Sequence, residues 1–190
     1  MTAAVRCSPD GTGVLLVDWQ ERLAPAMAAE LHAPHLRNAE RLLQGAALFR
    51  VPAVATEQYP KGLGPTLPSL KALLAGEGLA APIVEKIDFS AWAVPAVREQ
   101  MSASGRRSWI VAGMEAHVCV FQTVRDLCEA GHTVWLLRDA VVSRTRENWE
   151  VGVELCRAAG ARVASTESVL FDLCGRAEGE AFKALSRLVR

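Results

Sequence analysis

The sequence predicts an α/β protein of three layers, in which a doubly wound, mostly parallel sheet of about six strands carries helices on both faces. Two observations predict this class. Short apolar runs alternate along the chain with longer segments whose apolar residues recur at helical spacing. No low-complexity tract, repeat or linker interrupts this alternation, so a single domain over residues 1–190 is expected. Alternating strands and helices pair in parallel through right-handed crossovers, which place helices on both faces.

The first elements follow from local patterns. Residues 14–17 are an apolar run that predicts a buried strand, and an Ala- and Pro-rich loop follows them. Residues 35–49 are expected to form a helix because their apolar side chains repeat every three or four positions. Residues 51–56 predict the second strand. Residues 57–67 contain two prolines and two glycines and predict a loop, whose length suggests a functional role.

A short helix, a strand and a longer helix are expected next. Residues 68–75 predict the short helix, with Pro68 in the first turn, where proline is tolerated. Residues 83–86 predict the third strand. The next helix begins either at Ser90, which suits an N-cap, or near Val94, because Pro95 would break a hydrogen bond inside a helix.

The second half repeats the pattern, and glycines close two of its helices. It comprises strand 108–112, helix 118–130 before Gly131, strand 133–137, helix 147–159 before Gly160, strand 162–164, and helices 167–173 and 178–189.

Composition excludes several functional classes. Twenty-one basic residues balance twenty-one acidic ones, so no net field favours nucleic acid or an anionic membrane as a partner. No apolar run approaches the ~20 residues of a membrane span, and the amino terminus lacks the apolar core of a signal peptide. Five cysteines without a Cys-x-x-Cys pair indicate free thiols, and a cytoplasmic location is expected.

Three chemically reactive side chains lie at predicted strand ends. Asp18 and Lys86 end the first and third strands, and Cys119 opens the helix after the fourth. The carboxyl ends of parallel strands meet at one edge of the sheet, where ligands bind. A thiol in the first turn of a helix lies near unpaired N–H groups and the positive end of the helix dipole, so a lowered pKa is predicted for Cys119.

Each of these residues also has a purely structural interpretation. Cys119 could be a small buried hydrophobe, Asp18 the cap of a turn and Lys86 a solvent-facing charge. In the functional interpretation, Asp18 takes the thiol proton as general base and Lys86 stabilises both anions by its charge.

Three motifs in this order carry a resemblance to a known family. They are Val-Asp-Trp-Gln at residues 17–20, Glu-Lys-Ile-Asp-Phe-Ser at residues 85–90 and Gly-Met-Glu-Ala-His-Val-Cys-Val at residues 113–120. With them the chain resembles the isochorismatase-like cysteine hydrolases, a superfamily that includes nicotinamidases, carbamoylsarcosine amidohydrolases and isochorismatases. The resemblance covers about residues 13–170. Residues 56–65 look most like the small isochorismatase-domain-containing branch.

The resemblance implies roles for individual residues. Cys119 would attack a carbonyl carbon, Asp18 would take and return protons, and Lys86 would stabilise the thiolate and the carboxylate. It also implies a cis peptide bond between Met114 and Glu115, and an oxyanion hole formed by the backbone N–H groups of Glu115 and Cys119. A homo-oligomer and a small-molecule substrate are expected, and no cofactor.

The chain departs from the nicotinamidase pattern. Nicotinamidases carry an Asp-x-His motif after the second strand to bind a metal, whereas Thr56-Glu57-Gln58 contains no histidine. No metal site is therefore expected. A small, mostly apolar substrate pocket is predicted from the side chains that flank the three reactive residues in sequence, although Phe89 and Trp92 could equally pack in the core. These pocket residues are Trp19, Gln20, Tyr59, Phe89 and Trp92.

The expected activity is metal-independent hydrolysis of a small amide-like or related carbonyl compound. Two alternatives remain open: a vinyl-ether hydrolase of the isochorismatase kind, and a non-catalytic interaction protein on the same fold. A dyad of Cys119 with His117 is disfavoured, because residues two apart on a helix point to different faces. Arg144 and Arg146 are expected to be exposed.

Overall fold

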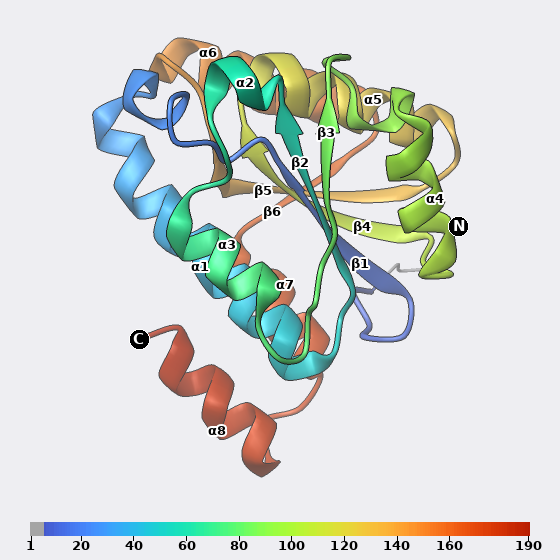
Figure 1. Ribbon diagram of the computed structural model, residues 1–190. Coiled ribbons are helices and arrows are strands. Elements are labelled where there is room, and N and C mark those ends of the chain that lie inside the picture. Colours follow the sequence, from blue (N-terminus) through green and yellow to red (C-terminus); the bar gives the residue numbers. More distant parts are fainter. Residues whose placement is uncertain (1–5) are drawn as a thin grey trace.

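The computed structural model describes residues 6–190 and has one six-stranded parallel sheet at its centre (Figure 1). The strand order is β3-β2-β1-β4-β5-β6, and every neighbouring pair is parallel. The chain therefore builds one half of the sheet outward from β1 and returns to build the other half from β4, which confirms the doubly wound class. The strands are β1 (Thr12–Val17), β2 (Ala53–Gln58), β3 (Ile83–Lys86), β4 (Ser108–Met114), β5 (Thr133–Val142) and β6 (Arg162–Ala164).

Helices cover both faces of this sheet (Figure 1). One layer contains α1 (Ala29–Phe49), α3 (Pro68–Ala75), α7 (Thr166–Cys174) and α8 (Gly179–Leu188). The other contains α4 (Pro95–Ala103), α5 (Phe121–Glu129) and α6 (Arg146–Ala158). The short elements are α2 (Pro60–Leu63), the 3₁₀ turns η1 (Ala24–Ala26) and η2 (Ala91–Ala93), and the π-helical η3 (Ala116–Val120).

The two central strands, β1 and β4, are buried along their whole length. Helices on both faces exclude water from them, which explains why, after the first residue of each strand, their sequences are apolar runs without polar alternation. Within residues 6–190, no helix is long and apolar enough to cross a membrane.

Several element boundaries differ from the sequence-based expectations. Helix α1 begins six residues early, at Ala29, and contains Pro34, because Leu31 and His35 of its first turns are buried against the rest of the protein. The predicted loop 57–67 contains the single-turn helix α2. Strand β5 runs to Val142, since it continues to pair with β4 beyond a register shift after Val111.

Candidate active site

Three strand ends on the same edge of the sheet bring Asp18, Lys86 and Cys119 together. Asp18 directly follows β1, Lys86 is the last residue of β3, and Cys119 lies in η3 just after β4. Asp18 has a φ of 53°, in the left-handed region that aspartate enters more readily than most residues. The sequence thus placed each residue at a strand end, and the parallel sheet makes these ends neighbours.

Asp18 and Lys86 form an ion pair inside the protein. The Lys86 Nζ lies 2.6 Å from the Asp18 Oδ2, and neither side chain is accessible to solvent. The Thr56 hydroxyl donates a 2.7 Å hydrogen bond to the other carboxylate oxygen of Asp18. A buried ion pair of this kind is costly to break by removing one partner, because the other charge then stays buried alone.

Lys86 is held by more acceptors than the sequence suggested. Its Nζ donates to the Gln58 Oε1 at 2.6 Å and lies near the backbone carbonyls of Asp88, at 3.2 Å, and Phe89, at 3.1 Å. With Asp18, these groups provide four oxygens for three N–H donors. The lysine head is therefore fixed in position and cannot swing out to solvent without losing all of them.

Gln58 is a site residue that the sequence-based reasoning missed. It pairs with Lys86 in the register of β2 and β3, and its amide nitrogen donates to the carbonyl of Ile87 at 2.7 Å. Gln20 in turn bonds the Gln58 backbone on both sides, accepting from its N–H at 2.8 Å and donating to its carbonyl at 3.0 Å. Only the register of the sheet could have revealed this role, since Gln58 and Lys86 are far apart in the chain.

Cys119 lies against the buried pair. The sulfur is within hydrogen-bonding reach of both the Asp18 carboxylate and the Lys86 ammonium, and the residue is only 6% exposed. Oδ2 of Asp18 has the ammonium as its ion-pair partner but accepts no well-aligned hydrogen bond, which leaves a lone pair for the thiol proton. The arrangement is therefore that of a thiol poised beside a base.

The predicted lowering of the Cys119 pKa is wrong. Burial raises the pKa of Cys119 to about 12, the neighbouring Asp18 carboxylate adds to the increase, and Lys86 offsets part of it. The dipole of an α-helix lowers the pKa of a thiol in its first turn, but residues 116–120 form a π-helical turn, and desolvation of the thiolate is the larger effect. In the resting protein the sulfur is a neutral thiol.

The pKa of the Asp18 carboxyl is also shifted upward. Burial raises the pKa of this carboxyl above its ordinary value, and the Lys86 charge, together with the hydrogen bonds from Lys86, Thr56 and Cys119, opposes that shift. A carboxylate that water does not solvate accepts a proton more readily than an exposed one. Asp18 is consequently a stronger base than a surface aspartate.

The backbone around Met114 brings the strand and the cysteine turn together. The Met114–Glu115 peptide bond is cis, as the resemblance implied. Gly113 packs so close to β1 that a Cβ there would clash with the carbonyl oxygen of Val17. On the other side of the turn, a Cβ on Gly152 of α6 would lie 2.6 Å from the backbone of Ala116 and His117.

The outer side of the cysteine turn carries charged and polar side chains. Glu115 forms a 2.8 Å ion pair with Arg144, whose side chain is 56% exposed, as expected for this arginine. The His117 Nδ1 lies 3.0 Å from the Ser143 hydroxyl. His117 thus has a hydrogen-bond partner other than Cys119.

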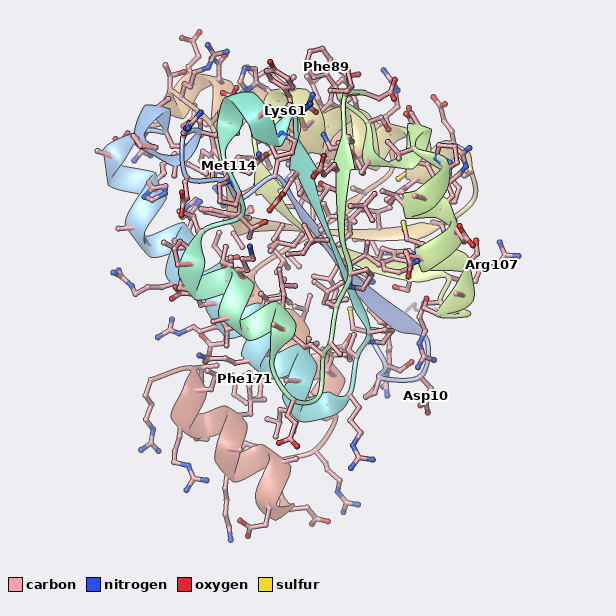
Figure 2. All side chains as sticks on the ribbon, in the orientation of Figure 1. Asp10, Lys61, Phe89, Arg107, Met114 and Phe171 are labelled. Carbon is pink, nitrogen blue, oxygen red and sulfur yellow. The ribbon has the colours of Figure 1, made fainter. Side chains whose placement is uncertain are left out.

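The five predicted pocket residues have different positions. Trp19 and Gln20 are fully buried, and the Gln20 amide binds backbone groups of Gln58 and Gly64. Tyr59 and Phe89 are 52% and 53% exposed and flank the strand that ends in Lys86. Figure 2 shows Phe89 at the same end of the molecule as Lys61.

Tyr59 lines a depression of about 460 Å³ together with Lys61, Ile87 and backbone or side-chain atoms of Lys86. The ring of Trp92, in contrast, lies against the imidazole of His132, with the ring centres 4.9 Å apart, and lines a separate cavity. Among the described residues, no cluster of three or more His, Cys, Asp or Glu side chains has the geometry to hold a metal ion.

Comparisons with a family model and with individual relatives identify the same family. The model of the isochorismatase domain matches residues 12–168 of the chain. The bovine (Bos taurus) isochorismatase domain-containing protein 2 is 35% identical over 190 residues, which cover 97% of this chain and 86% of that protein.

Solved structures share the fold. A protein described as the MAR1 ribonuclease of Caenorhabditis elegans superposes with a TM-score of 0.89 at 32% identity, over 97% of this chain and 92% of that one. The YcaC gene product of Escherichia coli, described as an octameric hydrolase of unknown specificity, superposes with a TM-score of 0.90 at 23% identity, over 99% and 92% of the two chains.

Proposed function

Because the chain belongs to the isochorismatase family, we propose that it is a metal-independent cysteine hydrolase in which Cys119 is the nucleophile. The observation that carries this proposal is the contact of the Cys119 thiol with a fully buried Asp18–Lys86 ion pair. A structural thiol needs no such neighbours. Burying an ion pair has a desolvation cost, which favours a functional explanation for its place beside the thiol.

In the first step the neutral thiol loses its proton to Asp18 as the sulfur attacks the substrate carbonyl carbon. The new carbon–sulfur bond pushes the carbonyl electron pair onto oxygen, which gives a tetrahedral oxyanion. Lys86 stays charged throughout and lowers the energy of the developing thiolate. The backbone N–H groups of Glu115 and Cys119 would donate to the oxyanion, a role that the family resemblance supports.

In the second step the tetrahedral intermediate collapses, and the carbon–nitrogen bond of an amide substrate breaks. Asp18 returns its proton to the leaving ammonia or amine, and the acyl group stays on sulfur as a thioester. Water then attacks the thioester, Asp18 takes a proton from that water, and the sulfur leaves and is reprotonated. The products are the acid and the free enzyme.

The surroundings favour a small substrate. Cys119 is nearly enclosed, and the depression lined by Tyr59 also includes Lys86, the ion-pair partner of Asp18. The depression next to Tyr59 has a volume in the range of small-molecule sites.

The proposal is tested by incubating the protein with a panel of small primary amides and measuring ammonia. Turnover should be lost in Cys119→Ser and retained in Cys174→Ser, which changes a thiol that donates to a backbone carbonyl elsewhere. Intact-mass spectrometry after rapid acid quenching should show an acyl adduct on the wild-type protein alone. Ammonia release that persists in Cys119→Ser would contradict the proposed nucleophile.

Two other activities are separated by the same variants. A vinyl-ether hydrolase would release pyruvate from isochorismate even in Cys119→Ala, because that reaction needs no sulfur nucleophile. The C. elegans relative is described as a ribonuclease, so single-stranded RNA belongs in the panel. We favour acyl transfer over both because the buried acid–base pair is adjacent to a thiol. A non-catalytic protein would turn over none of these compounds.

We also propose that the protein acts as a homo-oligomer in the cytoplasm. The E. coli relative is described as octameric, and all five cysteines of this chain are free thiols, which suits a reducing compartment. Light scattering coupled to size-exclusion chromatography would give the number of subunits, and a monomer at micromolar concentration would overturn the proposed assembly.

A further inference from the structure

A second cavity lies between α4 and α5, away from the three strand ends. It has a volume of about 370 Å³, and its walls come from Trp92, the carboxyl end of α4 and the residues after α5. Cys119 precedes α5, whereas the cavity includes residues just beyond its last turn. At 1.5 Å per residue, the nine residues of α5 separate the two sites by about 13 Å.

Several residues that line this cavity are cationic or can form hydrogen bonds. Arg106, Arg107 and His132 contribute to it with the Ser102 hydroxyl, and no acidic residue does. Figure 2 shows Arg107 on the outer side of α4, where its guanidinium reaches solvent. A cavity with two guanidinium groups and no carboxylate has a positive potential that favours an anion.

These cations also lack internal partners. Within residues 6–190, neither Arg106 nor Arg107 has a side-chain hydrogen bond or an ion pair, whereas Arg144 and Arg125 each bond a carboxylate. The Nε of Arg106 and the Nδ1 of His132 are both buried without a hydrogen-bond partner. Buried polar groups in native proteins normally have a partner, so these two indicate a missing one.

The electrostatics of the imidazole support the same conclusion. Burial lowers the pKa of His132, the backbone of Arg107 offsets part of that shift, and the nearby charge of the Arg107 guanidinium lowers the pKa again. An anion between the arginine and the imidazole would relieve this repulsion. Planar guanidinium groups match the oxygen pairs of phosphate better than they match a halide ion.

The wall formed by Trp92 adds an apolar surface. Its ring is held edge-on to the His132 imidazole, and Arg98 donates to the Trp92 carbonyl at 2.7 Å, which fixes the segment. The volume exceeds that of a bare phosphate and leaves room for an attached flat group.

We propose that this cavity binds a small phosphate-bearing ligand, with Arg106, Arg107 and His132 on the phosphate and Trp92 beside whatever group the phosphate carries. This site is separate from the acyl-transfer site and does not depend on the activity proposed there. Free phosphate and a phosphate monoester with a flat ring share this recognition chemistry.

The experiment is isothermal titration calorimetry of the full chain with inorganic phosphate, AMP and adenosine, at constant ionic strength set with sodium chloride. Phosphate or AMP should bind with a Kd of about 1 mM or lower, and adenosine, which has no phosphate, should not bind. AMP binding tighter than phosphate would identify a ring-bearing ligand, and equal affinities would identify the free ion. Both results support the site.

Variants assign the binding to the cavity. Arg106→Gln/Arg107→Gln should weaken phosphate or AMP binding at least tenfold. Arg187→Gln/Arg190→Gln, which removes the same charge from the carboxy-terminal end, should leave the affinity unchanged. Arg107→Gln alone, at an exposed position that folding does not depend on, should weaken binding by a smaller factor. Absence of binding by phosphate and AMP at about 10 mM, or equal losses in the two double variants, would overturn the proposal.

Discussion

Replacing Asp18 with asparagine is expected to lower the pKa of the Cys119 thiol and, in the same variant, to abolish turnover. The carboxylate has two opposite effects on the sulfur. Its charge disfavours the thiolate in the resting protein. In the proposed mechanism its basicity also removes the thiol proton during attack. Asparagine keeps the shape of the side chain but has neither the charge nor the basicity, so the two effects should separate.

The size of the change follows from the geometry. A pKa of about 12, against the ordinary 9.0, leaves roughly a thousandfold less thiolate at neutral pH. The more basic thiolate is intrinsically more nucleophilic, by a factor of roughly 16–30 over three units, so the net rate of thiol exchange should be about 30–60-fold below that of an ordinary cysteine. The negative charge of Asp18, about 4 Å from the sulfur, disfavours the thiolate by up to ~4 kcal/mol at an effective dielectric of 20. Removing that charge should therefore lower the pKa of the Cys119 thiol by about 1–3 units.

The assay is modification by methyl methanethiosulfonate, followed at each cysteine by peptide mass spectrometry between pH 7 and 10. In the wild type, the logarithm of the Cys119 rate should rise by one per pH unit with no plateau below pH 10. In Asp18→Asn, the rate at pH 7.5 should increase by about 3–60-fold, while turnover falls by ~10²-fold or more. Asp10→Asn, which changes an exposed aspartate before the opposite end of β1 from Asp18 (Figure 2), should change neither quantity.

Two outcomes would refute this reasoning. A wild-type rate that levels off near pH 7 would mean that the thiol is already ionised, so that burial does not dominate its pKa. A slower reaction of Cys119 in Asp18→Asn would mean that the carboxylate does not oppose thiolate formation.

Three further substitutions test the surroundings of the proposed nucleophile. Lys86→Ala leaves Asp18 buried and unpaired, so the free energy of unfolding measured in urea should fall by about 3–5 kcal/mol. Adding Asp18→Asn to that variant should restore part of the lost stability, and additive losses would contradict a direct ion pair. Gln58→Leu removes a hydrogen bond to the charged Lys86, so it should lower the free energy of unfolding by about 1.5–3 kcal/mol and also lower kcat. The control Gln100→Leu, at an exposed position, should change neither the stability nor kcat. Gly152→Ala places a Cβ 2.6 Å from the backbone of η3, so it should destabilise the protein by roughly 1–3 kcal/mol and reduce kcat; wild-type kcat would show that η3 can shift without consequence.

Much of the fold is predictable from local patterns because its strands are buried on both faces. After their first residues, Thr12 and Ser108, β1 and β4 are apolar, which makes them visible as continuous runs, and the helices between them show one apolar stripe each. The bounds of α3, β3 and β6 agree with the sequence-based prediction at both ends. The predicted helix boundaries were wrong where tertiary contacts outweighed local preferences. Helix α1, for example, continues through Pro34 because Leu31 and His35 are buried.

Local motifs and periodicity were enough to predict the alternation of strands and helices along the chain, the family, and the positions of Asp18, Lys86 and Cys119 at strand ends, because these are properties of neighbouring residues. Three features required the folded chain: Gln58 holds Lys86, Trp92 lines another cavity, and burial raises the pKa of the Cys119 thiol. These depend on strand register and on exclusion of water by distant segments, and desolvation acts on a side chain through everything packed around it.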